Sequence, residues 1–150
     1  MEKRKNILCV SYGGGHAAML APVVKELQKN KELNVYVMGL TTGGKYLREN
    51  GIHSFGFSEY SFLVGRQYEK IGQQLLEPKS QSQLVPVKES IAYLGINMLE
   101  LIDLYGEKEA FDRYEKMGRQ EFLPVNFFSG LLSHLNIDLL ISTNSPRSEQ

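Results

Sequence analysis

The chain has 150 residues, of which 42% are hydrophobic and 23% charged, and its 17 basic residues balance 17 acidic ones. A formal net charge of zero gives no electrostatic reason to expect nucleic acid as a partner, and the composition is typical of one soluble globular domain. No stretch approaches the roughly 20 apolar residues of a membrane span, and no signal peptide is recognisable. Because the single Cys9 cannot form an internal disulfide, we expect a cytoplasmic protein.

The first predicted element is an apolar strand at residues 7–10, whose lack of alternation indicates that helices cover both of its faces. Three glycines follow at residues 13–15, and an apolar periodicity then predicts a helix over residues 16–30. Pro22 lies inside that segment. We expect either that Pro22 begins the regular helix after an irregular first turn, or that the helix bends there.

Further strands are expected at residues 34–39 and 53–57, with a short helix at 45–50 between them. Strands linked in this way cross over right-handed into a parallel sheet. The remaining periodicities predict helices at 67–76, 87–105, 107–117 and 124–135 and a last apolar strand at 137–142. The expected fold is therefore α/β, a Rossmann-like three-layer sandwich with a mostly parallel sheet of about four strands in the order 3-2-1-4.

The last eight residues leave the final strand with a helix-start pattern, in which Ser145 is the N-cap and Pro146 the first helical residue. A helix of one turn is not stable in water, because nucleation is costly and only later residues offset it. We therefore expect residues 1–150 to be the N-terminal part of a longer protein, and we leave open whether the natural chain ends at Gln150.

The glycine turn resembles a dinucleotide fingerprint, because Gly13, Gly15 and Ala18 fit the pattern G-x-G-x-x-(G/A). That fingerprint also requires an acid at the end of the second strand, where residues 38–42 read MGLTT. No Gly-Lys-Ser/Thr follows the glycines, which excludes a Walker-type phosphate loop. We expect no nicotinamide cofactor. A strand that enters a helix through glycines still presents free backbone amides to an anion, so Gly14 also belongs to the predicted binding turn.

His16 follows the glycines at the carboxyl end of the first strand, the position where ligands bind in open α/β sheets. A neutral imidazole at that place could accept a proton from a sugar hydroxyl, although a merely structural histidine is an equal alternative.

If the strand order is 3-2-1-4, the loop after the last strand faces the glycine turn. We therefore predict binding roles for Asn144, Ser145, Arg147 and Ser148. Arg147 offers a planar fork of donors that suits a phosphate or a carboxylate. The alternative for each residue alone is a capped helix start with an exposed arginine.

Residues 12–27, with the motif Tyr12-Gly13-Gly14-Gly15-His16, resemble the N-terminal domain of GT-B-fold glycosyltransferases and of the related non-hydrolysing UDP-N-acetylglucosamine 2-epimerases. The strand at residues 137–142 and the loop after it also look like a later part of that domain. The resemblance implies an acceptor-side domain whose glycine turn lies near the donor phosphates, with His16 as the base or as a transition-state contact. A C-terminal domain would bind most of the nucleotide sugar.

The function expected from this resemblance is transfer of a sugar from a UDP-sugar to an acceptor hydroxyl, by an inverting or retaining route, with no cofactor and no catalytic metal. The expected partners are the nucleotide sugar, an acceptor, and a C-terminal domain or partner chain; a lipid-linked acceptor would be the one route to membrane contact. The fragment alone should be inactive. The alternatives are a UDP-sugar 2-epimerase and a non-catalytic binding module completed by a partner chain.

Overall fold

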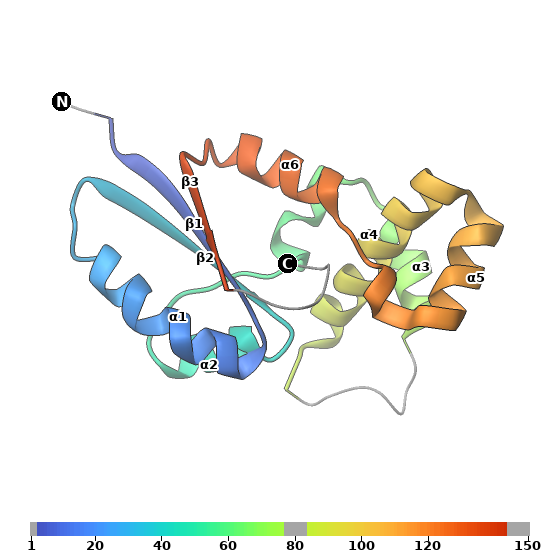
Figure 1. The fold of residues 1–150 in the computed structure, drawn as a ribbon, viewed down its shortest axis with the longest axis horizontal. Helices are drawn as coiled ribbons and strands as arrows, with labels where there is room; N and C mark the ends of the chain where they lie inside the picture. The colour runs from blue at the N-terminus through green and yellow to red at the C-terminus, as the bar shows by residue number, and fades with distance from the viewer. Residues whose placement is uncertain (1–2, 77–83, 144–150) are drawn as a thin grey trace. The chain divides into compact units, whose positions relative to one another are not determined.

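The structure is a computed structural model that describes residues 3–76 and 84–143 (Figure 1). These residues form two compact units. The sheet unit contains the described residues up to Gly56 and those from Leu131 onward, and the helical unit is Phe57–Gly130. Among the helices of the described residues, none combines the length and the apolar character needed to cross a membrane.

The sheet unit has a parallel three-stranded sheet with β1 in the centre, so the α/β class and the parallel pairing are confirmed. Its register aligns Ile7 of β1 with Val35 on one side and with Leu139 on the other. The order β2-β1-β3 contains the predicted neighbours of the first strand. The elements of this unit are β1 (Lys5–Tyr12), α1 (Gly13–Leu27), β2 (Leu33–Leu40), α2 (Gly43–Glu49) and β3 (Leu139–Ser142).

The strand predicted at residues 53–57 is reduced to a single bridge, so the structure shows three strands and not the four expected. Phe55 pairs with Met38 on the outer edge of β2: its N–H donates to the carbonyl of Val37 and its carbonyl accepts from Gly39. The ladder does not reach Phe57, the next residue whose amide could face β2, because that amide donates instead to the carboxylate of Glu89.

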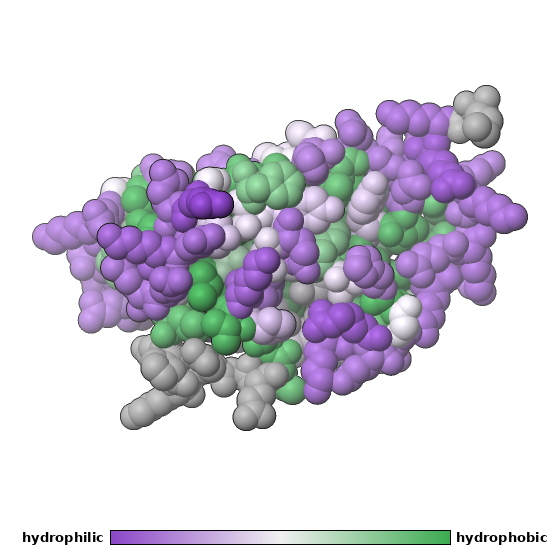
Figure 2. Space-filling model, turned by 180° about the vertical axis from the view of Figure 1, so that it is seen from behind, coloured by the Kyte–Doolittle hydropathy of each residue, from purple (hydrophilic) through white to green (hydrophobic). Residues whose placement is uncertain are grey.

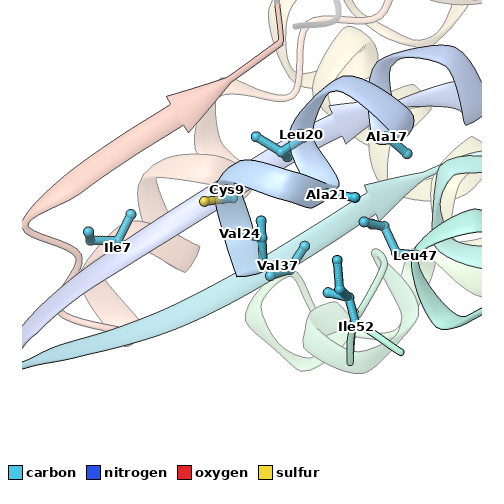
Figure 3. Close-up of a cluster of buried hydrophobic side chains, with 9 residues drawn as sticks. All are labelled: Ile7, Cys9, Ala17, Leu20, Ala21, Val24, Val37, Leu47 and Ile52. Atoms are coloured by element: carbon cyan, nitrogen blue, oxygen red, sulfur yellow. The ribbon is translucent and has the colours of Figure 1, made fainter. Parts of the chain in front are cut away.

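Both faces of β1 are buried, which accounts for its uninterrupted apolar sequence. Leu8 and Val10 occupy one face, and Ile7 and Cys9 the other. On the second face, side chains of α1 pack onto the sheet together with side chains from the α2 region (Figure 3). This core consists of Ile7, Cys9, Ala17, Leu20, Ala21, Val24, Val37, Leu47 and Ile52.

Helix α1 begins at Gly13, three residues earlier than predicted, and continues through Pro22. The alternative in which Pro22 begins the regular helix is therefore wrong. Pro22 is on the solvent side of the helix, where the carbonyl left without an i+4 donor can bind water.

The helical unit is built around α4 (Val87–Tyr105), whose bounds and those of α5 (Glu107–Met117) agree with the prediction. Helices α3 and α4 meet through glycines: a Cβ on Gly95 would lie 2.0 Å from the carbonyl oxygen of Tyr68, and one on Gly72 would lie 2.1 Å from that of Ile91. The unit's other elements are η1 (Ser58–Leu63), α3 (Gln67–Leu75), η3 (Gly118–Glu121) and the first part of α6 (Val125–His134).

Two glutamates of α4 hold the starts of other segments. The Glu89 carboxylate accepts from the amides of Phe57 and Ser58 at 2.6 and 2.9 Å. Glu100 is buried and accepts from Asn126 and Phe127, in the first turn of α6, at 3.1 and 2.7 Å. Burial raises the pKa of both carboxyls, although the amide donors act in the opposite direction. The ends of η1 and α6 are thus stabilised by carboxylates from a distant helix.

Candidate functional site

The glycine turn lies at the carboxyl end of the central strand, as predicted. Gly13 has a φ of +66°, a conformation that favours glycine, and it lets the chain pass directly from β1 into α1. The N-cap residue Tyr12 makes no side-chain capping bond, and the first turn contains no acidic residue. Because the first amides of a helix have no intrahelical acceptor, this turn presents N–H groups and a positive dipole end to a ligand.

The side-chain positions of Gly14 and Gly15 are open. Apart from the neighbouring residues and the helix's own backbone, a Cβ built on either glycine would meet no described atom within 4 Å, and Gly15 is exposed. An anion can therefore approach the backbone here without displacing a side chain.

A second turn adjoins the first at the same edge of the sheet. A Cβ on Gly43 would lie 3.2 Å from the carbonyl oxygen of Gly13, and one on Gly13 would lie 4.0 Å from the hydroxyl of Thr42. Thr41 has a positive φ of 52°, which is uncommon for a residue with a branched side chain. The two outgoing loops of β1 and β2 are thus packed backbone to backbone, which makes the glycine turn a well-supported feature.

His16 is the fourth residue of α1 and is half-buried, directly before the fully buried Ala17. The structure thus brings His16 together with Gly13, Gly14 and Gly15 in the first turn of one helix. The other predicted residues, which are Asn144, Ser145, Arg147 and Ser148, lie outside the described residues. Strand β3 does leave the sheet beside β1, where the N–H of Thr143 donates to the carbonyl of Val10 at 3.2 Å.

Two buried hydroxyls at this edge were not predicted. The side-chain oxygens of Ser11 and Thr143 are both inaccessible to solvent, and neither has a hydrogen-bond partner within the described residues. Val10 pairs with Ser142, so the next position of the register places Ser11 beside Thr143. The signal in the sequence is a hydroxyl residue directly after an apolar run, in ILCVS and again in LLIST.

Cys9 is on the same face of β1 and is not a candidate nucleophile. Burial raises the pKa of its thiol to about 11, so the thiol stays protonated at neutral pH. In residues 3–76 and 84–143, no group of three or more His, Cys, Asp or Glu side chains is arranged to hold a metal ion.

The helical unit has a pocket of its own, of about 270 Å³, between η1, α3, α4 and the start of α6. Its buried acid is Glu100, but both oxygens of that carboxylate already accept backbone amides. The other polar side chains that line the pocket are Gln67, Asp103 and Asn126.

Comparisons of the chain with protein-family models, with curated proteins and with solved structures give no match. The chemistry of the site is therefore inferred from the positions of its own residues. Free helix amides, two buried hydroxyls and a histidine gather where parallel strands end, and this combination suits a phosphorylated ligand beside a group that loses a proton.

Proposed function

We propose that the chain forms the acceptor-side domain of a cytoplasmic glycosyltransferase of GT-B type, which transfers a sugar from a UDP-sugar to an acceptor hydroxyl. The observation that supports this best is the uncapped glycine turn at the end of the central parallel strand, with His16 in the same helical turn. In this proposal the sheet unit belongs to a Rossmann-like three-layer sandwich, in which residues 53–57 take the outer position beside β2 through the single bridge of Phe55 with Met38.

The proposed chemistry divides the turn into two roles. The imidazole of His16 accepts the proton of the acceptor hydroxyl as the acceptor oxygen bonds to the anomeric carbon. The bond between that carbon and the β-phosphate oxygen breaks, and the electron pair leaves with UDP. The amides of Gly14 and Gly15 and the positive end of α1 stabilise the charge that develops on the phosphate.

The remaining roles in the proposal belong to groups outside the described residues. Arg147, with Asn144, Ser145 and Ser148, would bind phosphate or sugar from the loop after β3. Most of the donor would be held by a C-terminal domain or a partner chain, which makes residues 1–150 inactive by themselves. The acceptor supplies a hydroxyl, and a lipid-linked acceptor would bring the enzyme to a membrane surface.

The test compares His16→Ala with His53→Ala, an exposed histidine to which no role is assigned. UDP release from a panel of UDP-sugars is measured with the chain combined with its donor-binding half. We expect His16→Ala to slow transfer by about 10²- to 10⁴-fold, the usual contribution of a general base, and His53→Ala to leave the rate unchanged.

Equal rates for wild type and His16→Ala would remove His16 from the mechanism. Failure of every UDP-sugar to turn over would refute the transferase proposal. Conversion of the UDP-sugar to its epimer without an acceptor would identify a 2-epimerase instead.

A further inference from the structure

We propose that the hydroxyls of Ser11 and Thr143 are ligand-binding groups, which donate hydrogen bonds to the phosphate oxygens of a nucleoside diphosphate held at the start of α1. This inference rests on the proposed function, because it assigns two further residues to the phosphate part of the same site. Neither hydroxyl belongs to the glycine turn: Ser11 is in β1, and Thr143 directly follows β3.

The hydroxyls of Ser11 and Thr143 are buried without a partner among the described residues. Both oxygens are solvent-inaccessible, and Ser11 as a whole is 0% exposed, yet neither oxygen makes a hydrogen bond to any described residue. Burying a hydroxyl without a partner disfavours folding, so native structures seldom leave one unpaired. Two unpaired hydroxyls at adjacent register positions, one in β1 and one directly after β3, point to a partner outside the described residues, and a bound ligand is the partner proposed.

Both hydroxyls are at positions whose side chains face α1. Ser11 has the same parity along β1 as Ile7 and Cys9, and these two side chains pack against α1 (Figure 3). Thr143 has the same parity along β3 as Ile141, which packs against the same core. Both hydroxyls therefore lie on the face of the sheet that α1 covers, at the end where α1 begins.

The donors at this end of the sheet suit the oxygens of a diphosphate. The amides of the first turn of α1 can donate to one side of a phosphate, and a serine and a threonine hydroxyl are further donors that need no net charge. No acidic side chain in the first turn of α1 competes with an anion. A diphosphate, which has more acceptor oxygens than one helix turn can satisfy, is the ligand that uses both sets of donors.

The experiment measures binding of UDP, and separately of inorganic pyrophosphate, to the whole chain by isothermal titration calorimetry. The variants are Ser11→Ala and Thr143→Val. We expect each to weaken binding roughly tenfold or more, the usual effect of one hydrogen bond to a charged group. Ser142→Ala is the matched control, because Ser142 is exposed, adjacent to Thr143 and of opposite parity on the same strand. Its binding should equal that of the wild type.

Thermal unfolding without ligand provides a readout that separates this role from a structural one. A hydroxyl that is buried only for a ligand is unpaired in the free protein, so its removal should raise the melting temperature or leave it unchanged. A clear fall in melting temperature for Ser11→Ala and Thr143→Val would show that the hydroxyls stabilise the fold, and would overturn the inference.

Unchanged binding in both variants, or no binding of either probe to the wild type, would also overturn it. The outcomes remain distinct from those for the proposed function. If binding depends on the two hydroxyls but no UDP-sugar is consumed, the inference survives and the transferase does not. If transfer depends on His16 but UDP binding is unchanged in both hydroxyl variants, the transferase proposal survives and the inference about the hydroxyls does not.

Discussion

Cys9 and Ser11 are both fully buried on the same face of β1, but burial has different consequences for their side chains. A thiol is a weak hydrogen-bonding group, so Cys9 behaves as a small apolar residue in the core beneath α1. Burying a hydroxyl without a hydrogen bond costs free energy, and the hydroxyl of Ser11 has no hydrogen-bond partner in the described residues. Cys9 thus belongs to the core, whereas we propose that Ser11, two positions along the same strand, binds a ligand.

The burial of Cys9 predicts a thiol that reacts only when the sheet unit opens. Its pKa of about 11 lies above the ordinary value of 9.0, so the folded state retains the proton that the unfolded chain loses. The thiol therefore weakens folding as the pH rises from about 9 towards 11 and has no effect on stability below that range. At pH 8 we expect a disulfide reagent to label Cys9 in urea but hardly at all in buffer. Rapid labelling of the native protein would contradict the burial.

Helices α3 and α4 are the elements whose packing depends most on single atoms. Backbone carbonyls of each helix lie where the other would place a Cβ on Gly72 or Gly95. Such an approach requires glycine on both helices and brings their axes close together. In the same unit, Glu89 and Glu100 hold the starts of η1 and α6 by accepting two amides each.

We expect Gly95→Ala to destabilise the protein by about 3 kcal/mol, towards the upper end of the usual cost of overpacking, because its new Cβ would lie 2.0 Å from the Tyr68 carbonyl oxygen. Gly130→Ala on α6 is the control, since its Cβ would contact only the end of Leu63, at 4.0 Å. That change should be neutral or stabilising by up to about 1 kcal/mol, because alanine favours a helix more than glycine does. Urea unfolding followed by circular dichroism measures both, and equal midpoints would refute the close packing.

The elements also show what a sequence can predict and what it cannot. The bounds of α4 and α5 follow from local information, because the apolar period is clear and Gly106 and Gly118 end the helices. The prediction of a full strand at residues 53–57 was wrong. The amide of Phe57, which would have continued the ladder, donates instead to the distant side chain of Glu89. At the candidate site, the glycine turn was predictable from its motif. The Ser11–Thr143 pair was not, because it depends on the register between strands far apart in the sequence.

At the scale of the whole molecule, the surface combines a formal net charge of zero with exposed apolar side chains, several of which are visible among the hydrophilic residues of the face in Figure 2. Leu139 and Leu140 are 53% and 45% exposed on β3, which is an edge strand of the sheet formed by the described residues. An apolar edge strand can pair with another chain, and zero net charge provides little repulsion against it.

We therefore expect Leu140→Lys to reduce self-association near neutral pH, because a lysine on an edge strand opposes pairing between chains. Met19→Lys is the matched control: it adds the same charge at a side chain that is 73% exposed on α1, away from the edge. Light scattering as a function of protein concentration measures the effect. An equal reduction in both variants would show that net charge alone is responsible, and that the edge of β3 is not involved.

The central position of β1 has a consequence for how the protein is made. Asn6 at the start of β1 bonds to Asp138, 132 residues later, just before β3 begins. A ribosome adds about 5–20 residues per second, so β3 is synthesised on the order of ten seconds after β1. One edge of β1 has no partner strand during that time. During that interval the nascent polypeptide exposes a row of unsatisfied amides and carbonyls along its most apolar segment, which is the kind of substrate that chaperones retain until the closing strand arrives.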